Sequence, residues 1–234
     1  MSVAENVAQV RQRIAAAALR AVRDPAEITL MAVSKTFPVQ SIREAYEAGI
    51  RVFGENRVQE FSGKFGQLVD LKDAEWHMIG HLQSNKASAA AEIFSSIDSV
   101  DSLKLAEKLE VSAHKLGKKL SVLIEINVGG EAAKSGLAPD SDQLEELLGS
   151  PPRFKYIEFR GLMTVPPFAE DVQQSRPFFR KLRQLRDQIA ARNLPALRMD
   201  TLSMGMSHDF EVAIEEGSTC VRVGTAIFGE RTKR

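Results

Sequence analysis

The residue whose position most clearly suggests chemistry is Lys35, which follows the apolar run of residues 28–33 after a single serine. The run predicts a buried strand, and because side chains alternate along a strand, Lys35 shares a face with Val33. At the carboxyl end of a barrel strand that face is the interior, where burial lowers the pKa of an amine. A neutral amine can attack an aldehyde and form a Schiff base. The alternative is a structural lysine whose ammonium extends into solvent at the rim.

Two segments near the C-terminus combine glycine with small hydroxyl residues where strands are expected to end. They are Leu202–Ser207 and Val221–Ala226. Gly205 and Gly224 allow the backbone to approach a phosphate closely, and Ser203 and Thr225 offer hydroxyl donors. As the seventh and eighth strands of a barrel, they would lead into the loops that recurrently bind phosphate in that fold. The alternative is that these residues only build turns. Ser207 is also suited to cap the helix that follows it.

Arg222 shares a strand face with Cys220 and Gly224, which would direct its guanidinium into the barrel mouth. A buried arginine requires an acceptor. One interpretation is a structural carboxylate partner. The other is contact with a ring nitrogen of a bound cofactor, which would keep that nitrogen unprotonated and make the cofactor a poor electron sink.

Short apolar segments that alternate with helical stretches must position these side chains. Candidate strands lie near residues 28–33, 51–54, 76–79, 94–97, 122–126, 159–163, 201–203 and 220–223. Helical periodicity is clearest over residues 3–14, 102–116 and about 175–192. Strands that alternate with helices imply a parallel sheet, and eight such units close a (β/α)8 barrel. An open doubly wound sheet is the alternative, because periodicity does not distinguish the two. No linker divides the chain, so we expect a single domain over residues 1–234.

The composition excludes several classes of protein. The 31 basic and 31 acidic residues balance, so no charge excess points to nucleic acid or a membrane surface. Cys220 is the only cysteine, which rules out a disulfide framework within the chain. The N-terminal segment alternates small apolar and charged residues, unlike a signal peptide, and no apolar run is long enough to span a bilayer. We therefore expect a cytoplasmic protein and, without an evident exposed apolar stripe, a monomer.

Other polar residues give weaker signals. His77 and His81 have the spacing of two metal ligands on a helix, but the residues between them indicate a strand end and include no glutamate. Loop packing or contact with a cofactor edge is the better interpretation of these histidines. Glu55 and Glu60 are expected to be solvated or to face the rim. Cys220 is expected to act as a small buried apolar residue.

Taken together, the motifs resemble the pyridoxal phosphate homeostasis protein family, whose barrel is similar to the N-terminal domain of alanine racemase. The matching segments are Ala32–Lys35, Phe53–Glu60, Trp76–Lys86, Ile126–Gly136, Gly161–Thr164, Leu202–Ser207 and Val221–Gly229. They occur in the family's order and cover essentially the whole chain. The resemblance implies an α/β fold, a single (β/α)8 TIM barrel of fold type III that binds pyridoxal 5′-phosphate (PLP), without a C-terminal β domain.

The resemblance also assigns roles to individual residues. It implies a PLP aldimine at Lys35, a place for Arg222 near the pyridine nitrogen and a place for Asn56 near the ring. It implies phosphate contacts from Ser203, Met204 (through its backbone), Gly205, Gly224 and Thr225. It implies neither a metal nor a catalytic residue. The protein would hold PLP, limit the free aldehyde, and pass the cofactor to PLP-dependent apoenzymes.

Two enzymatic functions are the alternatives. A racemase of the alanine racemase type needs an acid–base group on each face of its substrate, and Lys35 could serve only one. The opposing tyrosine of that family belongs to a second, β-rich domain, whereas Tyr46 and Tyr156 are expected on a helix or a loop away from the mouth. Weak racemase-type side activity is compatible with this pattern. The second alternative is a Schiff-base aldolase barrel that needs no cofactor and binds a sugar phosphate.

Overall fold

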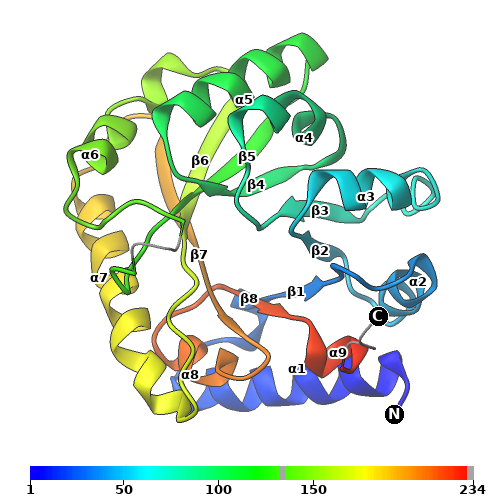
Figure 1. Cartoon of the computed structure of the whole chain (residues 1–234). Coiled ribbons are helices and arrows are strands. Elements are labelled where there is room, and N and C mark those ends of the chain that lie inside the picture. The colour runs from blue at the N-terminus through cyan, green and yellow to red at the C-terminus, as the bar shows by residue number, and fades with distance from the viewer. Residues whose placement is uncertain (132–134, 231–234) are drawn as a thin grey trace.

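Eight parallel strands form a closed barrel in the computed structural model, which describes residues 1–131 and 135–230 (Figure 1). The strands are β1 (Thr29–Val33), β2 (Val52–Glu55), β3 (Glu75–Met78), β4 (Ser96–Val100), β5 (Leu120–Glu125), β6 (Ile157–Met163), β7 (Leu197–Met206) and β8 (Cys220–Val223). Each strand pairs with the next, and β8 pairs with β1, with Met31 opposite Arg222. This last pairing closes the sheet, so the barrel expected from the sequence is confirmed and the open doubly wound alternative is wrong.

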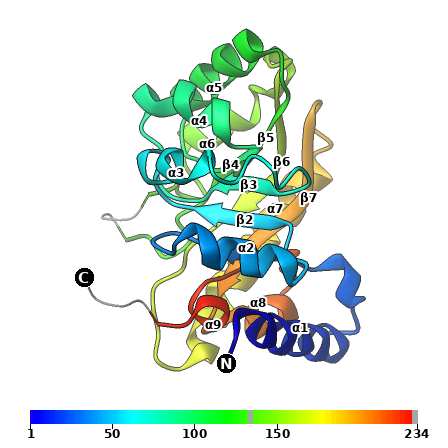
Figure 2. The ribbon, with the colours of Figure 1, turned by 90° about the vertical axis from the view of Figure 1, so that its right-hand side faces the viewer.

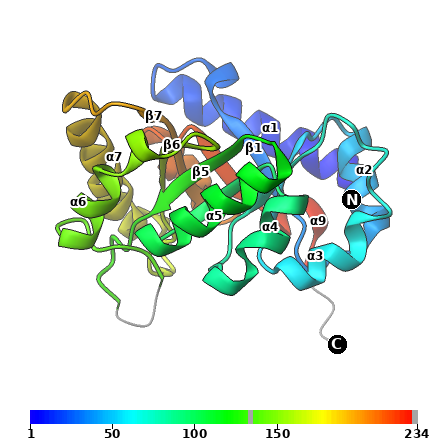
Figure 3. The same ribbon diagram turned by 90° about the horizontal axis from the view of Figure 1, so that it is seen from above.

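Helices surround the strands, as Figure 1 shows for α1 to α8. They are α1 (Val3–Arg20), α2 (Val39–Glu47), α3 (Val58–Phe65), α4 (Ala87–Ile93), α5 (Leu103–Leu116), α6 (Asp142–Leu148), α7 (Arg176–Ala191), α8 (Phe210–Glu215) and α9 (Thr225–Phe228). Short 3-10 turns are η1 (Pro25–Glu27), η2 (Ser84–Lys86), η3 (Pro151–Arg153) and η4 (Val172–Ser175). Figure 3 shows α1 and α5 on opposite sides of the strands. Across the described ranges, no helix is both long and apolar enough to cross a bilayer.

The first helix packs against elements from the other end of the chain. In Figure 2, α1 lies beside α8 and α9, and residue contacts join it to both. A capping box starts α1, in which the Ser2 hydroxyl accepts from the Glu5 amide and the Glu5 carboxylate accepts from the Ser2 amide. The buried stripe of α1 comprises Val7, Val10, Ile14, Ala17 and Ala18. The helical spacing of valine and isoleucine in the sequence therefore corresponds to a face buried against the barrel.

Two other predicted helices have clear local causes. The Ser102 hydroxyl accepts from the Leu105 amide at the start of α5, and Gly117 ends that helix in a left-handed conformation with φ +63°. Pro177 lies in the first turn of α7, where its missing amide hydrogen costs nothing. Both helices lie within two residues of their predicted bounds.

The two faces of the strands differ in chemistry. Outward-facing residues pack against the helices in the main hydrophobic cluster, which includes Phe53, Phe61, Phe94, Phe159, Phe179 and Phe210. Inward positions on β3, β4, β5, β7 and β8 carry polar side chains instead: His77, Asp98, Glu125, Ser203 and Arg222. A polar interior can hold charged groups directly beneath the barrel mouth, where active sites of this fold form.

Candidate functional site

A cavity opens at the carboxyl ends of the strands. Its volume is about 410 Å³, which lies within the usual range for small-molecule sites. The lining residues follow or end β1, β2, β3, β6, β7 and β8. They are Val33, Lys35, Phe37, Asn56, Ile79, Gly80, Val165, Phe168, Met206, Ser207, His208, Arg222, Gly224 and Thr225. Of the eight residues predicted to bind a cofactor, five therefore line one cavity: Lys35, Asn56, Arg222, Gly224 and Thr225.

Lys35 lies two residues beyond the end of β1 and is half-buried. Its neighbours differ from it in environment, because Ser34 is completely buried and Thr36 is exposed. Thr36 has φ +69°, an unfavourable conformation for a β-branched residue. The charge of Lys35 acts on Glu55 and slightly opposes the rise in the pKa of that carboxyl that burial causes. The backbone around Lys35 therefore turns sharply as it leaves the strand, and the lysine faces the cavity.

Arg222 lies at the floor of the cavity and is only 3% exposed. Its Nη1 donates to Ser203 Oγ at 2.8 Å, and its Nη2 donates to the carbonyl oxygen of Thr164 at 2.7 Å. These two bonds fix the plane of the guanidinium on neutral acceptors. Burial lowers the pKa of Arg222, against the attraction of nearby carboxylates that include Asp98 and Glu125. Among the described residues Arg222 forms no ion pair, so its direct partners are neutral, and the alternative of a structural carboxylate partner does not hold.

The other three predicted phosphate residues are absent from the lining of the cavity. Ser203, Met204 and Gly205 are buried, and none of them lines it. Gly205 has φ +94°, and a Cβ at this position would lie 2.5 Å from Ala213 Cβ on α8. Glycine is therefore required here for the close contact between β7 and α8. In this structure Ser203 supports Arg222, and Gly205 shapes the loop from below.

Ser207 has a different partner from the one expected. Its hydroxyl accepts from the amide of Gly224 at 3.1 Å and from that of Ala226 at 3.4 Å. It therefore joins the loop after β7 to the loop after β8. Helix α8 has Asp209 as its N-cap residue, so the expected capping by Ser207 is wrong. The sequence could not reveal this, because the serine is close to α9 only once the barrel has closed.

At the end of β2, one residue lines the cavity and its neighbour is buried away from it. Asn56 lines the cavity, and its Oδ1 atom is buried without a hydrogen-bond partner among the described residues. Glu55 is fully buried, where it accepts from the Ser34 hydroxyl at 2.8 Å. Burial raises the pKa of Glu55 to about 7, against the opposing charge of Lys64. The expectation that Glu55 is solvated or faces the rim is therefore wrong.

Glu125 is an ionisable residue that the sequence argument did not consider. It ends β5, is 8% exposed, and has one carboxylate oxygen with no hydrogen-bond partner among the described residues. Burial raises its pKa to about 7, and the negative charge of Asp101 adds to this effect. A polar residue at the end of an apolar strand was the available signal, since the same signal identified Lys35.

A second charged group lies at the opposite end of the barrel. A cavity of about 560 Å³ opens at the amino ends of the strands, and His77 is part of its lining. The Nδ1 atom of His77 lies 3.0 Å from Asp98, which is 1% exposed. Burial opposes the charge on His77, but Asp98 and Glu75 outweigh it and raise its pKa to about 9. In this fold the amino-end face usually serves stability, which favours a structural role for this pair.

The histidines do not form a metal site in the described part of the chain. His81 lies 3.1 Å from Asp101, and His77 pairs with a different carboxylate. No group of three or more metal-ligating side chains is found there. The spacing of these two histidines therefore reflects two separate pairs with aspartate.

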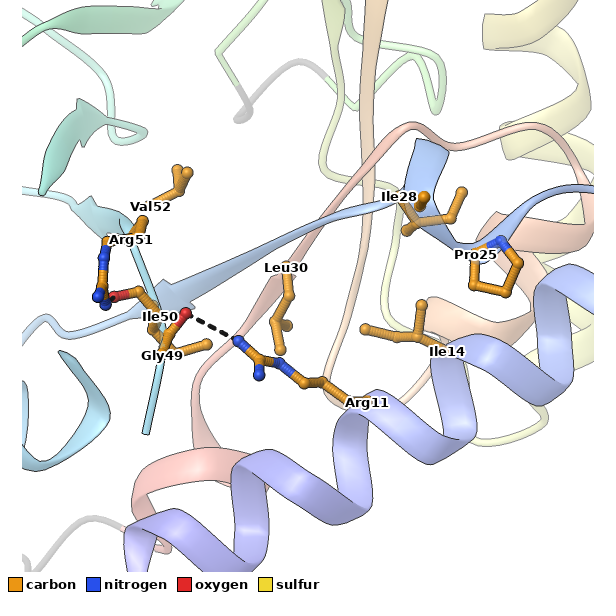
Figure 4. Close-up of a pocket in the computed structure, with 10 residues that line it drawn as sticks. Arg11, Ile14, Pro25, Ile28, Leu30, Gly49, Ile50, Arg51 and Val52 are labelled. Atoms are coloured by element: carbon orange, nitrogen blue, oxygen red, sulfur yellow. Dashed lines mark hydrogen bonds between the residues drawn. The ribbon is translucent and has the colours of Figure 1, made fainter. Parts of the chain in front are cut away.

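A further hollow lies outside the barrel, between α1 and the amino ends of β1 and β2 (Figure 4). Arg11 on α1 donates from Nη2 to the carbonyl oxygen of Gly49 at 2.8 Å across it. Its wall is mainly apolar, with Ile14, Ile28 and Leu30 among the lining residues. It shares no lining residue with the cavity around Lys35, and it contains no nucleophile.

Comparison with known proteins agrees with this geometry. Residues 2–232 match the family described as alanine racemase, N-terminal domain. The pyridoxal phosphate homeostasis protein of Aquifex aeolicus is 47% identical over 99% of both chains. That of Pseudomonas aeruginosa is also 47% identical, over 98% of this chain and 96% of its own length. The solved structure of PipY from Synechococcus elongatus with PLP bound has 38% identity and a TM-score of 0.85, covering 97% of this chain and 100% of PipY. The chain therefore belongs to the alanine racemase N-terminal domain family and, within it, to the pyridoxal phosphate homeostasis proteins.

Proposed function

We propose that this protein binds PLP in the cavity at the carboxyl ends of the strands and serves PLP homeostasis without catalysing a reaction of its own. The observation that carries the proposal is the placement of Lys35, Arg222 and Gly224 around one cavity. Homeostasis proteins with nearly half of their residues identical support it, as does the PLP-bound structure of PipY. All of these residues come from one barrel, so we further propose that residues 1–234 act as a single binding domain.

The residues present fit PLP in size and in chemistry. The cavity of about 410 Å³ holds an amine at one side and a buried cation at its floor. Asn56 also lines the cavity, and its buried Oδ1 atom has no hydrogen-bond partner among the described residues, so it is an acceptor that a small shift of the side chain could offer to a ligand. Gly224 directly follows β8 and lies against the end of β1, since a Cβ there would meet the Val33 carbonyl oxygen at 3.4 Å; Thr225 adds a hydroxyl. We assign the phosphate to Gly224 and Thr225, with Ser203, Met204 and Gly205 supporting them from below.

In this proposal Lys35 holds the cofactor covalently. When bound, PLP supplies an aldehyde that reacts with amines and a conjugated ring that can withdraw electrons from a bound amine. Lys35 would hold the cofactor through its Nζ atom, which would condense with the aldehyde carbon and release the aldehyde oxygen, with two protons, as water. For this step the ammonium must first lose its proton, because only the neutral amine is a nucleophile. The covalent bond retains the cofactor and lowers the concentration of free aldehyde.

The surroundings of the cavity favour holding over turnover. Arg222 next to the pyridine nitrogen would stay charged and would not transfer a proton, which leaves the ring a weak electron sink. Racemisation also needs an acid–base group on each face of the substrate. The two tyrosines lie elsewhere: Tyr46 on α2 hydrogen-bonds Asp73, and Tyr156 stacks on His114. Neither lines the cavity, which matches the expectation from the sequence.

Trapping of the cofactor tests the proposal directly. Purified protein incubated with PLP is expected to be yellow, and borohydride reduction is expected to leave a stable pyridoxyl group on the peptide that contains Lys35. A Lys35→Ala protein is expected to lose this adduct. A Lys72→Ala protein, which lacks an exposed lysine outside the cavity, is expected to keep it. The same adduct in the Lys35→Ala protein would refute the assignment.

Two further assays separate a carrier from an enzyme. Single-enantiomer amino acids in deuterated water are expected to keep their Cα hydrogen and their optical purity in the presence of the protein. Rapid exchange with loss of optical purity would show a racemase instead. Reactivation of PLP-dependent apoenzymes by the loaded protein tests delivery. We expect recovery of activity faster than the PLP dissociates into free solution.

A further inference from the structure

Two carboxylates and a lysine lie behind the strand end that carries Lys35. Glu55 ends β2, and Glu60 and Lys64 are one helical turn apart on α3. Lys64 Nζ donates to Glu60 Oε1 at 2.8 Å and lies 3.8 Å from Glu55 Oε1. We refer to Glu55, Glu60 and Lys64 as the charged brace. None of the three lines the cavity, so the brace does not belong to the binding surface.

The two carboxylates of the brace accept hydrogen bonds from the residues on both sides of Lys35. The hydroxyl of Ser34 donates to Glu55 Oε1 at 2.8 Å, and the amide of Thr36 donates to Glu60 Oε1 at 2.6 Å. The pKa of Glu60 is lowered, so its bond from Thr36 is made to a charged carboxylate, and such bonds are shorter and stronger than neutral ones. The backbone at Lys35 is therefore fixed through its two neighbours, and the side chain of Lys35 lines the cavity.

Thr36 needs this support. Its φ of +69° is one that threonine rarely adopts, and such a conformation persists only where surrounding contacts over-determine it. Besides the bond to Glu60, the turn is held by the amide of Phe37, which donates to the Ser34 carbonyl oxygen at 3.1 Å. Without the carboxylate, the chain would relax towards a conformation with negative φ and carry Lys35 with it.

The three residues of the brace are largely shielded from water. Glu55 is completely buried, and only 16% of the Lys64 side chain and 27% of the Glu60 side chain are exposed. Burial disfavours the charge on Glu60, but the bonds from Lys64 and Thr36 outweigh it and hold its pKa below the ordinary value. Glu60 also lies in the first turn of α3, where the helix dipole favours a negative charge.

We propose that Glu55, Glu60 and Lys64 are positioning residues for Lys35, which hold the β1–α2 turn so that the amine reaches the aldehyde of a bound ligand. This inference rests on the proposed function of the cavity. In this proposal the chain from the end of β2 to α3 has two roles. Asn56 lines the cavity, while Glu55 and Glu60 hold the backbone on either side of Lys35.

The test compares covalent with non-covalent binding in full-length protein. Glu60→Leu removes both acceptor and charge, Glu60→Gln keeps an acceptor, and Glu47→Gln changes an exposed carboxylate on α2 as the matched control. Incubation with PLP for increasing times, each followed by borohydride trapping, gives the rate of bond formation at Lys35. Pyridoxine 5′-phosphate, which has the ring and the phosphate but an alcohol in place of the aldehyde, measures non-covalent affinity.

We expect Glu60→Leu to slow adduct formation by roughly ten- to a hundredfold, with Glu60→Gln between it and the wild type. The affinity for pyridoxine 5′-phosphate is expected to change by less than about twofold, because the phosphate side of the cavity is untouched. Glu47→Gln is expected to match the wild type in both. An unchanged adduct rate in Glu60→Leu, or an equal loss of both quantities, would overturn the proposal.

The hydrogen-exchange rate of the Thr36 amide, measured without any cofactor, tests the role of the brace independently of the proposed function. The amide of Thr36 is expected to exchange roughly tenfold faster in Glu60→Leu than in the wild type, since it loses its acceptor. Equal exchange would overturn the brace even if PLP binds at Lys35. Conversely, if no adduct forms at Lys35 in the wild type but exchange responds as expected, the proposed function fails while the brace still holds the turn.

Discussion

Replacing Glu125 by glutamine is expected to change how stability depends on pH. In the folded protein the pKa of Glu125 is about 7, against an ordinary value of 4.5, because the carboxyl is buried. The folded state therefore keeps its proton more tightly than the unfolded state does. Below pH 4.5 both states are protonated, and the full stability is present. As the pH rises from 4.5 to about 7 the unfolded chain releases its proton first, so the stability falls.

The size of this effect follows from the two pKa values. A change from 4.5 to about 7 corresponds to about 3 kcal/mol of unfolding free energy, lost progressively over that interval. Glutamine cannot ionise, so the variant should not show this part of the loss. Its amide must also be accommodated in a buried site, which costs about 1 kcal/mol at every pH. The pH dependence of the difference between the two proteins is therefore the diagnostic quantity, rather than the difference at one pH.

Urea unfolding at a series of pH values measures it. The variant is expected to gain about 3 kcal/mol relative to the wild type between pH 4 and pH 8. Glu55 and His77 also contribute to the wild-type profile, but their contributions cancel in the comparison. Glu47→Gln, which removes an exposed carboxylate on α2, reports the general effect of one lost charge. A difference between wild type and Glu125→Gln that stays constant with pH would refute the reasoning.

Three further outcomes test other parts of the structure. Gly161→Ala is expected to lower stability by roughly 3 kcal/mol or more, because the new Cβ would lie 1.8 Å from the Thr201 carbonyl oxygen; a thermal melt like that of the wild type would contradict this. Asp98→Asn is expected to bring the NMR titration midpoint of His77 below its present pKa of about 9, and to remove a contribution to stability that is present below pH 6.5 and lost as the pH rises towards 9. Arg222→Lys is expected to cost about 1–3 kcal/mol in urea unfolding, because one ammonium cannot reproduce two bonds made by a planar fork and leaves a buried acceptor unpaired.

Much of the fold was predictable from local patterns. All eight strands were located, because short segments with apolar residues recur between helical stretches along the chain. The helices at 103–116 and 176–191 followed from their periodicity and end signals. The count of eight units favoured a barrel, but only the pairing of β1 with β8 decides that the sheet closes.

The candidate site was predictable to a lesser degree. Lys35, Arg222 and Gly224 were identified because each lies at a strand end on an inward-facing position, a property that strand alternation makes visible. Ser203 and Gly205 share a motif with residues that do line the cavity, yet they are buried beneath it. Depth along the barrel axis depends on strand stagger and bulges, such as the register shift between β7 and β8, and local sequence does not encode them.

Pairings between distant segments were decided by the tertiary structure alone. The Ser207 hydroxyl accepts a hydrogen bond from the Gly224 amide, and the Glu60 carboxylate on α3 accepts one from the Thr36 amide. The sequence by itself determined where strands end and which residue types stand there, because burial and alternation act over a few residues. Which of those ends meet, and whether a glutamate such as Glu55 is buried behind Lys35 or exposed to water, depends on strand register and on barrel closure. These are properties of the whole sheet, and no short stretch of sequence contains them.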